Sequence, residues 1–248
     1  MKTGQELHLG KYKAVFEIDD SCDSPVDGNT LGTMVTWHQN YDIGHIANPD
    51  YPKSRFKAVL MSDYLGYEEI DYPYWNTEED EEELDRLVQE NYLFKDLYIH
   101  DHGSVCVSTK PFLDPWDSGH LGFIYATKKE VRSSYQMDRQ TSFSFMPTGF
   151  RDNYSLLRKE ETLMLLGEEQ LDREIDVYNM WSQGDTWMYF VYEIADEDGP
   201  YIESCGSLIG ESEALESANE MLKCLNDSDY EGADYDQTVR CGQRLEIP

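Results

Sequence analysis

The chain has 248 residues, with 50 Asp and Glu against 20 Lys and Arg, and a net charge of −30. Its content of 40% hydrophobic and 13% aromatic residues is too high for a disordered acidic chain, so a folded core is expected. The charge repels nucleic acids and anionic membranes at long range and favours basic partners. Solubility, or adaptation to high salt, is the simpler alternative explanation of the same charge.

The cysteines and the N-terminus indicate a reducing compartment. The five cysteines are odd in number and widely spaced, and none forms a CxxC pair, which argues against a disulfide framework or a zinc knuckle. The first thirteen residues lack an apolar signal core, and no stretch approaches 18 apolar residues. We therefore expect the protein in the cytoplasm.

The first quarter of the chain predicts strands. Residues 11–18 alternate in polarity, and residues 31–37 form a second β-rich run. Residues 38–52 contain several breakers and are predicted to form a loop. The short apolar run at 56–61 fits either a strand or the start of a helix.

An aromatic and acidic segment follows. Aromatic side chains mixed with acids are typical of interaction surfaces, and Tyr72, Tyr74 and Trp75 lie in such a mixture. The acidic residues that come next, in a nearly unbroken run, are Glu78, Glu79, Asp80, Glu81, Glu82, Glu83 and Asp85. We predict that these ten residues bind a partner.

The acidic run is predicted to be helical. Leu84, Leu87 and Val88 have the i, i+3, i+4 spacing of one helical face. Asn76 or Thr77 can cap this helix, and acids in its first turn suit the helix dipole. The alternative to a binding strip is an ordinary solvated face on a well-capped helix.

The middle of the chain predicts a hairpin, a strand and a helix. Two β-rich runs, 97–100 and 104–109, flank an Asp-His-Gly turn. A buried strand is expected at 121–126 and a short helix from 128 to 135. Residues 136–158 are polar and are predicted to form a loop or an insertion.

The last third predicts helix, hairpin and helix. A long amphipathic helix is expected over 160–181, strands over 186–194 and 201–208, and a second helix over 211–225. The acidic tail 226–248 is predicted to be loose. Together these elements predict an α+β fold, with a mostly antiparallel sheet and helices packed on one face. No convincing linker appears, so one composite domain over 1–248 is expected.

The negative charge is concentrated in two blocks. Residues 61–120 carry 16 acids and 3 bases, and residues 181–248 carry the same numbers, whereas the other two stretches have a net charge of −2 each. Solubility alone would spread the charge more evenly. The unevenness favours specific acidic surfaces.

The candidates for chemistry are few. His100 and His102 would point to one side of a strand and, with Asp117 and His120, suggest a metal-dependent hydrolase or nuclease. A metal site needs three or more such groups to converge, and the Asp-His-Gly sequence also suits a plain turn. No phosphate-binding glycine motif is present, so no cofactor is expected. Catalysis is therefore the alternative to partner binding.

One stretch resembles a known family. Residues 100–132, HDHGSVCVSTKPFLDPWDSGHLGFIYATKKEVR, are similar to a widespread uncharacterised family of phage and plasmid proteins. Its pattern is roughly DHSG, then ST, then WDSGQxGxIY, and this chain departs from it with Gly103 for Ser and His120 for Gln. The family has no settled activity, so the motif residues carry over as structure and give no catalytic set.

The resemblance implies a mobile-element context. Accessory proteins of such elements often counter host defence, and acidic inhibitors can occupy basic nucleic-acid grooves in place of phosphates. The expectation is an acidic DNA mimic that binds a basic host effector, such as a CRISPR effector or a restriction nuclease, and does not bind nucleic acid or membrane itself. An interaction protein of the element is the further alternative.

Overall fold

The computed structural model of the chain describes residues 1–65, 78–141, 160–195 and 199–231. The chain forms two compact units. The terminal unit comprises residues 1–25 and 177–248, and the central unit comprises residues 26–176. The single composite domain expected from the sequence stays a prediction.

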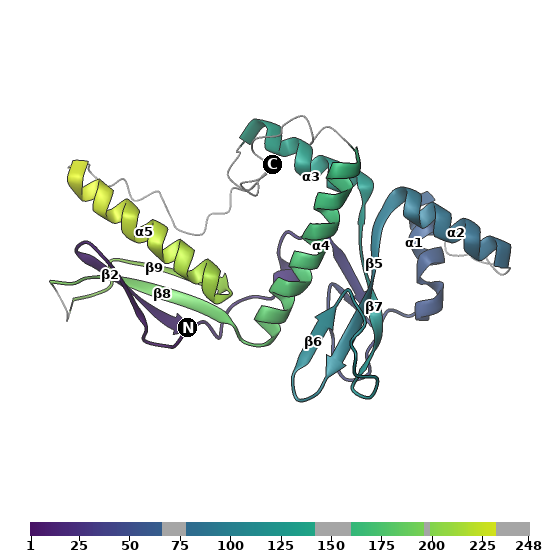
Figure 1. Cartoon of the computed structure of the whole chain (residues 1–248), viewed down its shortest axis with the longest axis horizontal. Coiled ribbons are helices and arrows are strands. Elements are labelled where there is room, and N and C mark those ends of the chain that lie inside the picture. Colours follow the sequence, from purple (N-terminus) through teal and green to yellow (C-terminus); the bar gives the residue numbers. More distant parts are fainter. Residues whose placement is uncertain (66–77, 142–159, 196–198, 232–248) are drawn as a thin grey trace. The chain divides into compact units, whose positions relative to one another are not determined.

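The terminal unit is an antiparallel sheet with the strand order β1-β2-β8-β9 and one helix, α5. Its elements are β1 (Glu6–Leu9), β2 (Tyr12–Ile18), β8 (Thr186–Glu193), β9 (Glu203–Ile209) and α5 (Glu211–Glu231). Helix α5 lies along one face of this sheet (Figure 1). The first strand and the last helix thus share one core, although they lie at opposite ends of the sequence.

Strand alternation and helix periodicity explain this packing. Alternate residues of β2, namely Tyr12, Ala14 and Phe16, are buried, and the ring of Phe16 meets that of Tyr189 edge to face at 6.0 Å. The buried residues of α5 recur at helical spacing and face the sheet. These residues are Ala214, Ala218, Leu222 and Leu225.

The central unit is a five-stranded sheet with the order β4-β3-β7-β5-β6. Among the described strands of this sheet, only β3 and β4 pair in parallel. The strands are β3 (Thr33–Thr36), β4 (Ile46–Ala47), β5 (Tyr92–Asp101), β6 (Val105–Ser108) and β7 (Ser118–Thr127). The helices are α1 (Phe56–Leu65), α2 (Glu78–Asn91), α3 (Lys128–Thr141) and α4 (Glu160–Ser182), with 3-10 turns at Pro25–Asp27 and Lys53–Arg55.

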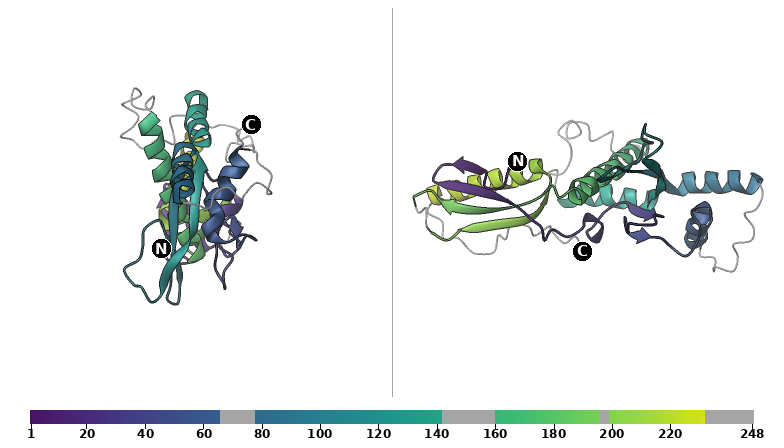
Figure 2. Two further views of the ribbon diagram at one scale, coloured as in Figure 1. Left: turned by 90° about the vertical axis from the view of Figure 1, so that its right-hand side faces the viewer. Right: turned by 90° about the horizontal axis from the view of Figure 1, so that it is seen from below.

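Both faces of the five-stranded sheet are covered (Figures 1 and 2). On one face, Tyr92 and Phe123 form a core with Phe56 of α1 and with Leu84 and Val88 of α2. In this core the rings of Phe56 and Phe123 are stacked at 5.1 Å, and aromatic pairs of this kind stabilise a fold beyond their buried area.

The other face packs against α4, and two glycines allow the close approach. A Cβ at Gly167 would lie 2.5 Å from Leu93 Cδ1, and a Cβ at Gly32 would lie 2.5 Å from Leu171 Cδ2. The carboxylate of Glu174 accepts hydrogen bonds from the backbone N–H groups of Leu31 and Gly32, each at 2.8 Å. Helix α4 therefore fixes the start of β3.

The α+β class and the mostly antiparallel pairing are confirmed. The four-stranded sheet has its helix on one face as expected, and the five-stranded sheet adds helices on its second face. The predicted strands, the hairpin and the four predicted helices are all present, with ends that differ by a few residues.

Several predicted details need correction. The ambiguous run at 56–61 is helical, the predicted loop 38–52 contains the two-residue strand β4, and β1 was not predicted. Residues 136–141 extend α3, and the rest of the predicted insertion, 142–158, lies outside the described residues. Residues 226–231 of the predicted loose tail extend α5, and 232–248 lie outside the described residues. In the described part of the chain, no helix has the length and apolarity to cross a membrane.

Gly122 is predicted to be essential to the β3–β7 pair. A methyl group there would lie 2.1 Å from the carbonyl oxygen of Val35 and 2.8 Å from Thr36 Cα, both of which are backbone atoms. Gly122→Ala should lower the free energy of unfolding by about 1–3 kcal/mol or more, because the two strands must separate. Gly119→Ala is the control in the same strand, since its Cβ would meet nothing within 4 Å. Equal urea midpoints for the two variants would contradict this packing.

Asp19 gives a pH-dependent prediction. Its carboxylate is buried and accepts hydrogen bonds from Ser207 N (2.7 Å) and from Ser21 N (3.0 Å) and Oγ (2.7 Å). Burial raises the pKa of Asp19, but these hydrogen bonds outweigh burial and the pKa is lowered. The stabilisation is therefore complete above the ordinary Asp pKa near 3.9 and is lost as pH falls through the lowered pKa.

Asp19→Asn should cost about 1–3 kcal/mol of unfolding free energy at pH 7, because an amide cannot accept all three bonds. The difference in unfolding free energy between this variant and the unsubstituted protein should be smaller at pH 3 than at pH 7. Urea unfolding at the two pH values measures it, with the exposed neighbour changed by Asp20→Asn as the control. A gap that is the same at both pH values would refute the role of the ionised carboxylate.

Candidate protein-binding surface

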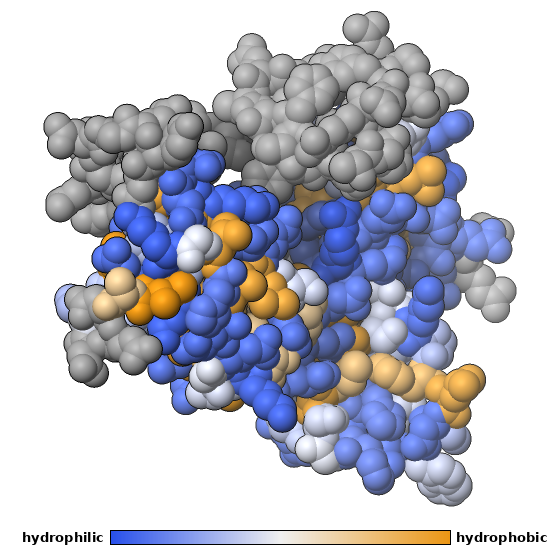
Figure 3. Space-filling view, turned by 60° about the vertical axis from the view of Figure 1, so that its left-hand side comes forward, coloured by the Kyte–Doolittle hydropathy of each residue, from blue (hydrophilic) through white to orange (hydrophobic). Residues whose placement is uncertain are grey.

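The described surface is predominantly hydrophilic, as Figure 3 shows for one face. The large hydrophobic residues that are exposed are Ile18, Tyr41, Ile46, Tyr64, Leu113, Trp116, Leu165, Tyr201 and Ile202. Isolated exposed apolar residues are normal on protein surfaces. The main candidate for a binding surface is therefore the excess of carboxylates.

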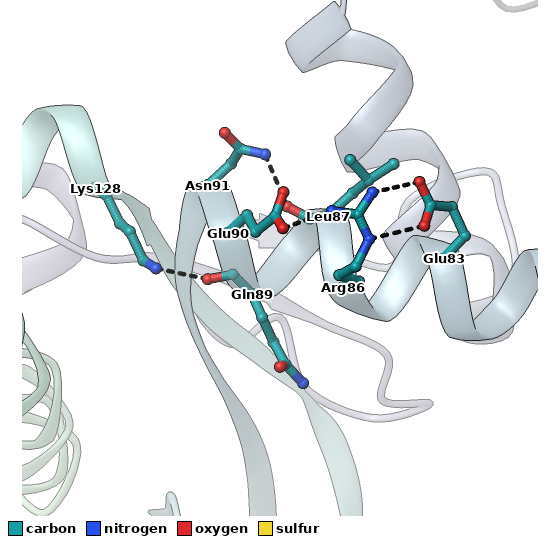
Figure 4. A network of polar contacts seen from close by, with 7 residues as sticks. All are labelled: Glu83, Arg86, Leu87, Gln89, Glu90, Asn91 and Lys128. Carbon is teal, nitrogen blue, oxygen red and sulfur yellow. Dashed lines mark hydrogen bonds and ion pairs between the residues drawn. The ribbon is translucent and has the colours of Figure 1, made fainter.

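Helix α2 carries most of the acidic run on an anchored scaffold. Its apolar residues Leu84 and Val88 are buried against α1 and the sheet, at 7% and 2% exposure. Lys57 of α1 contacts the carboxylate of Asp85 at 2.6 Å. Lys128, at the start of α3, donates to the carbonyl oxygen of Gln89 at 2.6 Å, where a cation suits the C-terminal end of the helix dipole (Figure 4).

One arginine neutralises part of this helix. Arg86 Nε donates to Glu83 Oε2 at 2.8 Å, and Arg86 Nη1 donates to Glu90 Oε1 at 2.5 Å (Figure 4). Hydrogen bonding to Arg86 lowers the pKa of the Glu83 carboxyl group, and the same bonds raise the pKa of Arg86. These i, i+3 and i, i+4 pairs are exposed, so they contribute little to stability.

Glu81 and Glu82 remain without a cationic partner among the described residues. Both side chains are exposed, and they precede the buried Leu84 on the same ordered helix. Their charges are therefore held in place by the backbone and are available to a ligand. A basic surface would gain from them without breaking an internal ion pair.

The structure describes the other predicted site residues only in part. Glu78, Glu79 and Asp80 begin α2, but their side chains are outside the described set. Tyr72, Tyr74 and Trp75 also lie outside the described residues, so their part in binding stays a prediction.

The second acidic block belongs to the terminal unit. There α5 carries three exposed carboxylates opposite its buried face: Glu213, Glu216 and Glu220. Each block thus supplies an acidic helix to its own unit, α2 to the central unit and α5 to the terminal unit. Of the two, only α2 has a nearly unbroken acidic sequence.

The residues proposed for a metal site form separate pairs. His102 Nδ1 contacts Asp117 Oδ2 at 2.7 Å, whereas His120 Nε2 contacts Asp96 at 3.1 Å. His100 lies 3.8 Å from Asp114. Within the described ranges, no group of three or more His, Cys, Asp or Glu residues is arranged to hold a metal ion. His102 and His120 are therefore each hydrogen-bonded to one carboxylate, and His100 lies beyond hydrogen-bonding distance from Asp114.

Sequence reasoning missed two residues at the β6–β7 connection. Leu113 is fully exposed and Trp116 is 91% exposed, although both belong to the stretch that carries the family resemblance. The sequence does hold a signal for them. Two large apolar residues lie beside Pro111 and Pro115, where the chain cannot continue a strand, so neither has a regular core position.

Comparisons of the chain with family models, with curated proteins and with solved structures found no match. The resemblance to phage and plasmid proteins thus stays a prediction from residues 100–132.

The histidine pairs predict that divalent metals have no effect on stability. Adding Mn²⁺ or Zn²⁺ should leave the melting temperature unchanged, because two ligands do not form a metal site. Thermal unfolding of the protein and of a His102→Ala, His120→Ala variant provides the measurement. A rise in melting temperature that this double variant abolishes would restore the metal-dependent hydrolase or nuclease as a candidate function.

Proposed function

We propose that this protein binds the basic, nucleic-acid-binding surface of a host defence effector, such as a CRISPR effector or a restriction nuclease, and thereby inhibits it. The observation that supports the proposal most is the set of exposed carboxylates on α2, of which Glu81 and Glu82 have no cationic partner among the described residues. The setting is the cytoplasm of the host cell.

The charge density of α2 is close to that of DNA. Residues 78–85 contain seven acids, and a helix rises about 1.5 Å per residue, so these eight residues carry one acid per roughly 1.7 Å of helix axis. Duplex DNA has one phosphate charge per about 1.7 Å. A Lys- and Arg-lined channel would therefore meet a similar linear charge on this helix and release its counterions in the same way.

The anchoring of α2 favours binding over simple solubility. A carboxylate on a mobile tail loses conformational freedom when it binds, whereas Leu84 and Val88 already hold this helix against the core. The host-defence context is supported by the mobile-element resemblance of residues 100–132. An interaction protein of the element itself would use the same surface on a different partner.

The proposal predicts protection of an invading phage. In a host with an active CRISPR effector or restriction nuclease, expression of the chain should raise the plating efficiency of the targeted phage. Glu81→Lys with Glu82→Lys should reduce this effect at least about tenfold, because two like charges would face a basic channel at a cost of 1.4 kcal/mol or more.

The control for this assay is Glu168→Lys with Glu169→Lys. These residues are an exposed pair on α4 with the same change in charge, and the variant should protect as well as the unsubstituted protein. Plating that the chain never raises would reject defence inhibition and favour a partner within the element. Equal losses in both double variants would reject α2 as the surface.

A further inference from the structure

The loop between β6 and β7 exposes two large apolar side chains. Leu113 is fully exposed, and the indole of Trp116 is 91% exposed. Both lie between Ser108, where β6 ends, and Ser118, where β7 begins. An exposed Trp is the residue type most often found as an anchor at protein interfaces.

The loop is held by its own hydrogen bonds. The backbone N–H of Trp116 donates to Asp114 Oδ1 at 2.9 Å, and Ser118 Oγ donates to the carbonyl oxygen of Asp114. The backbone N–H of Asp101 donates to the carbonyl oxygen of Asp117 at 2.8 Å, which ties the loop to β5. The backbone at Trp116 is therefore ordered before a partner arrives, so binding costs less entropy.

The carboxylates near Trp116 in the sequence favour a cationic partner. Asp114 and Asp117 lie two residues before and one residue after Trp116, and the loop's one cation is Lys110. His100 and His102 contact these two carboxylates. An aromatic face beside carboxylates attracts a cation, and a planar guanidinium can both stack on the ring and donate two hydrogen bonds to a carboxylate.

We propose that Trp116, with Asp114 and Asp117, forms a receptor for an arginine-bearing segment of a partner protein, and that Leu113 packs on the apolar part of that segment. The inference rests on the proposed function for the basic character of the partner, but it does not need α2. A second copy of this chain is disfavoured as the occupant by its net charge of −30. A nucleic acid would place phosphates beside the carboxylates.

The test follows the indole N–H resonances of the full chain by NMR, with Trp116→Phe to assign the Trp116 signal. The probe is a capped hexapeptide with three arginines, and its lysine counterpart is the comparison. The arginine peptide should shift the Trp116 signal in a saturable manner and bind more tightly than the lysine peptide. Asp114→Asn with Asp117→Asn keeps the side-chain shape and should weaken binding about threefold or more.

The matched control is Glu168→Gln with Glu169→Gln, which removes the same charge from an exposed pair on α4. An unshifted Trp116 signal, or equal weakening in both double variants, would overturn the receptor. If the unsubstituted protein fails to protect phage while its Trp116 signal still responds to the arginine peptide, this site stands and the proposed function alone is rejected.

Discussion

The antiparallel pair of β5 and β7 is the constraint on which the rest of the central unit depends. These strands lie at the middle of the five-stranded sheet, and they bury apolar residues on both faces. Helix α2 runs directly into β5 at Tyr92, and the loop that exposes Trp116 ends where β7 begins. Both candidate binding surfaces are thus oriented by one strand pair, which the close approach at Gly122 joins to β3.

The scarcity of positive charge explains why carboxylates remain available. Several of the 20 cations join one element of the central unit to another. These ion pairs are Lys57–Asp85, Lys95–Asp172 and Arg132–Glu160. Such exposed or half-exposed pairs add little to stability because solvent screens them, so the apolar cores supply most of the stability. The charge excess is then a property of the surface and leaves the fold intact.

Sequence reasoning found the elements with long, regular patterns and missed what depends on tertiary context. Leu84, Leu87 and Val88 were enough to predict α2, because their spacing fits only a helix. The run at 56–61 was too short to separate strand from helix, and the four residues of β1 gave too weak a pattern. The boundary between the two units falls within α4, so no linker marks it in the sequence. The exposure of Trp116 depends on a loop whose path no periodicity encodes.

The central claim is that the carboxylates of α2 replace DNA phosphates on a basic protein surface. The most direct measurement is the displacement of labelled DNA from a purified, guide-loaded CRISPR effector or a restriction nuclease by this protein, at several salt concentrations. The account predicts displacement that weakens steadily with the logarithm of salt concentration and disappears in the Glu81→Lys, Glu82→Lys variant. Displacement that is insensitive to salt, or unchanged by the charge reversal, would contradict it.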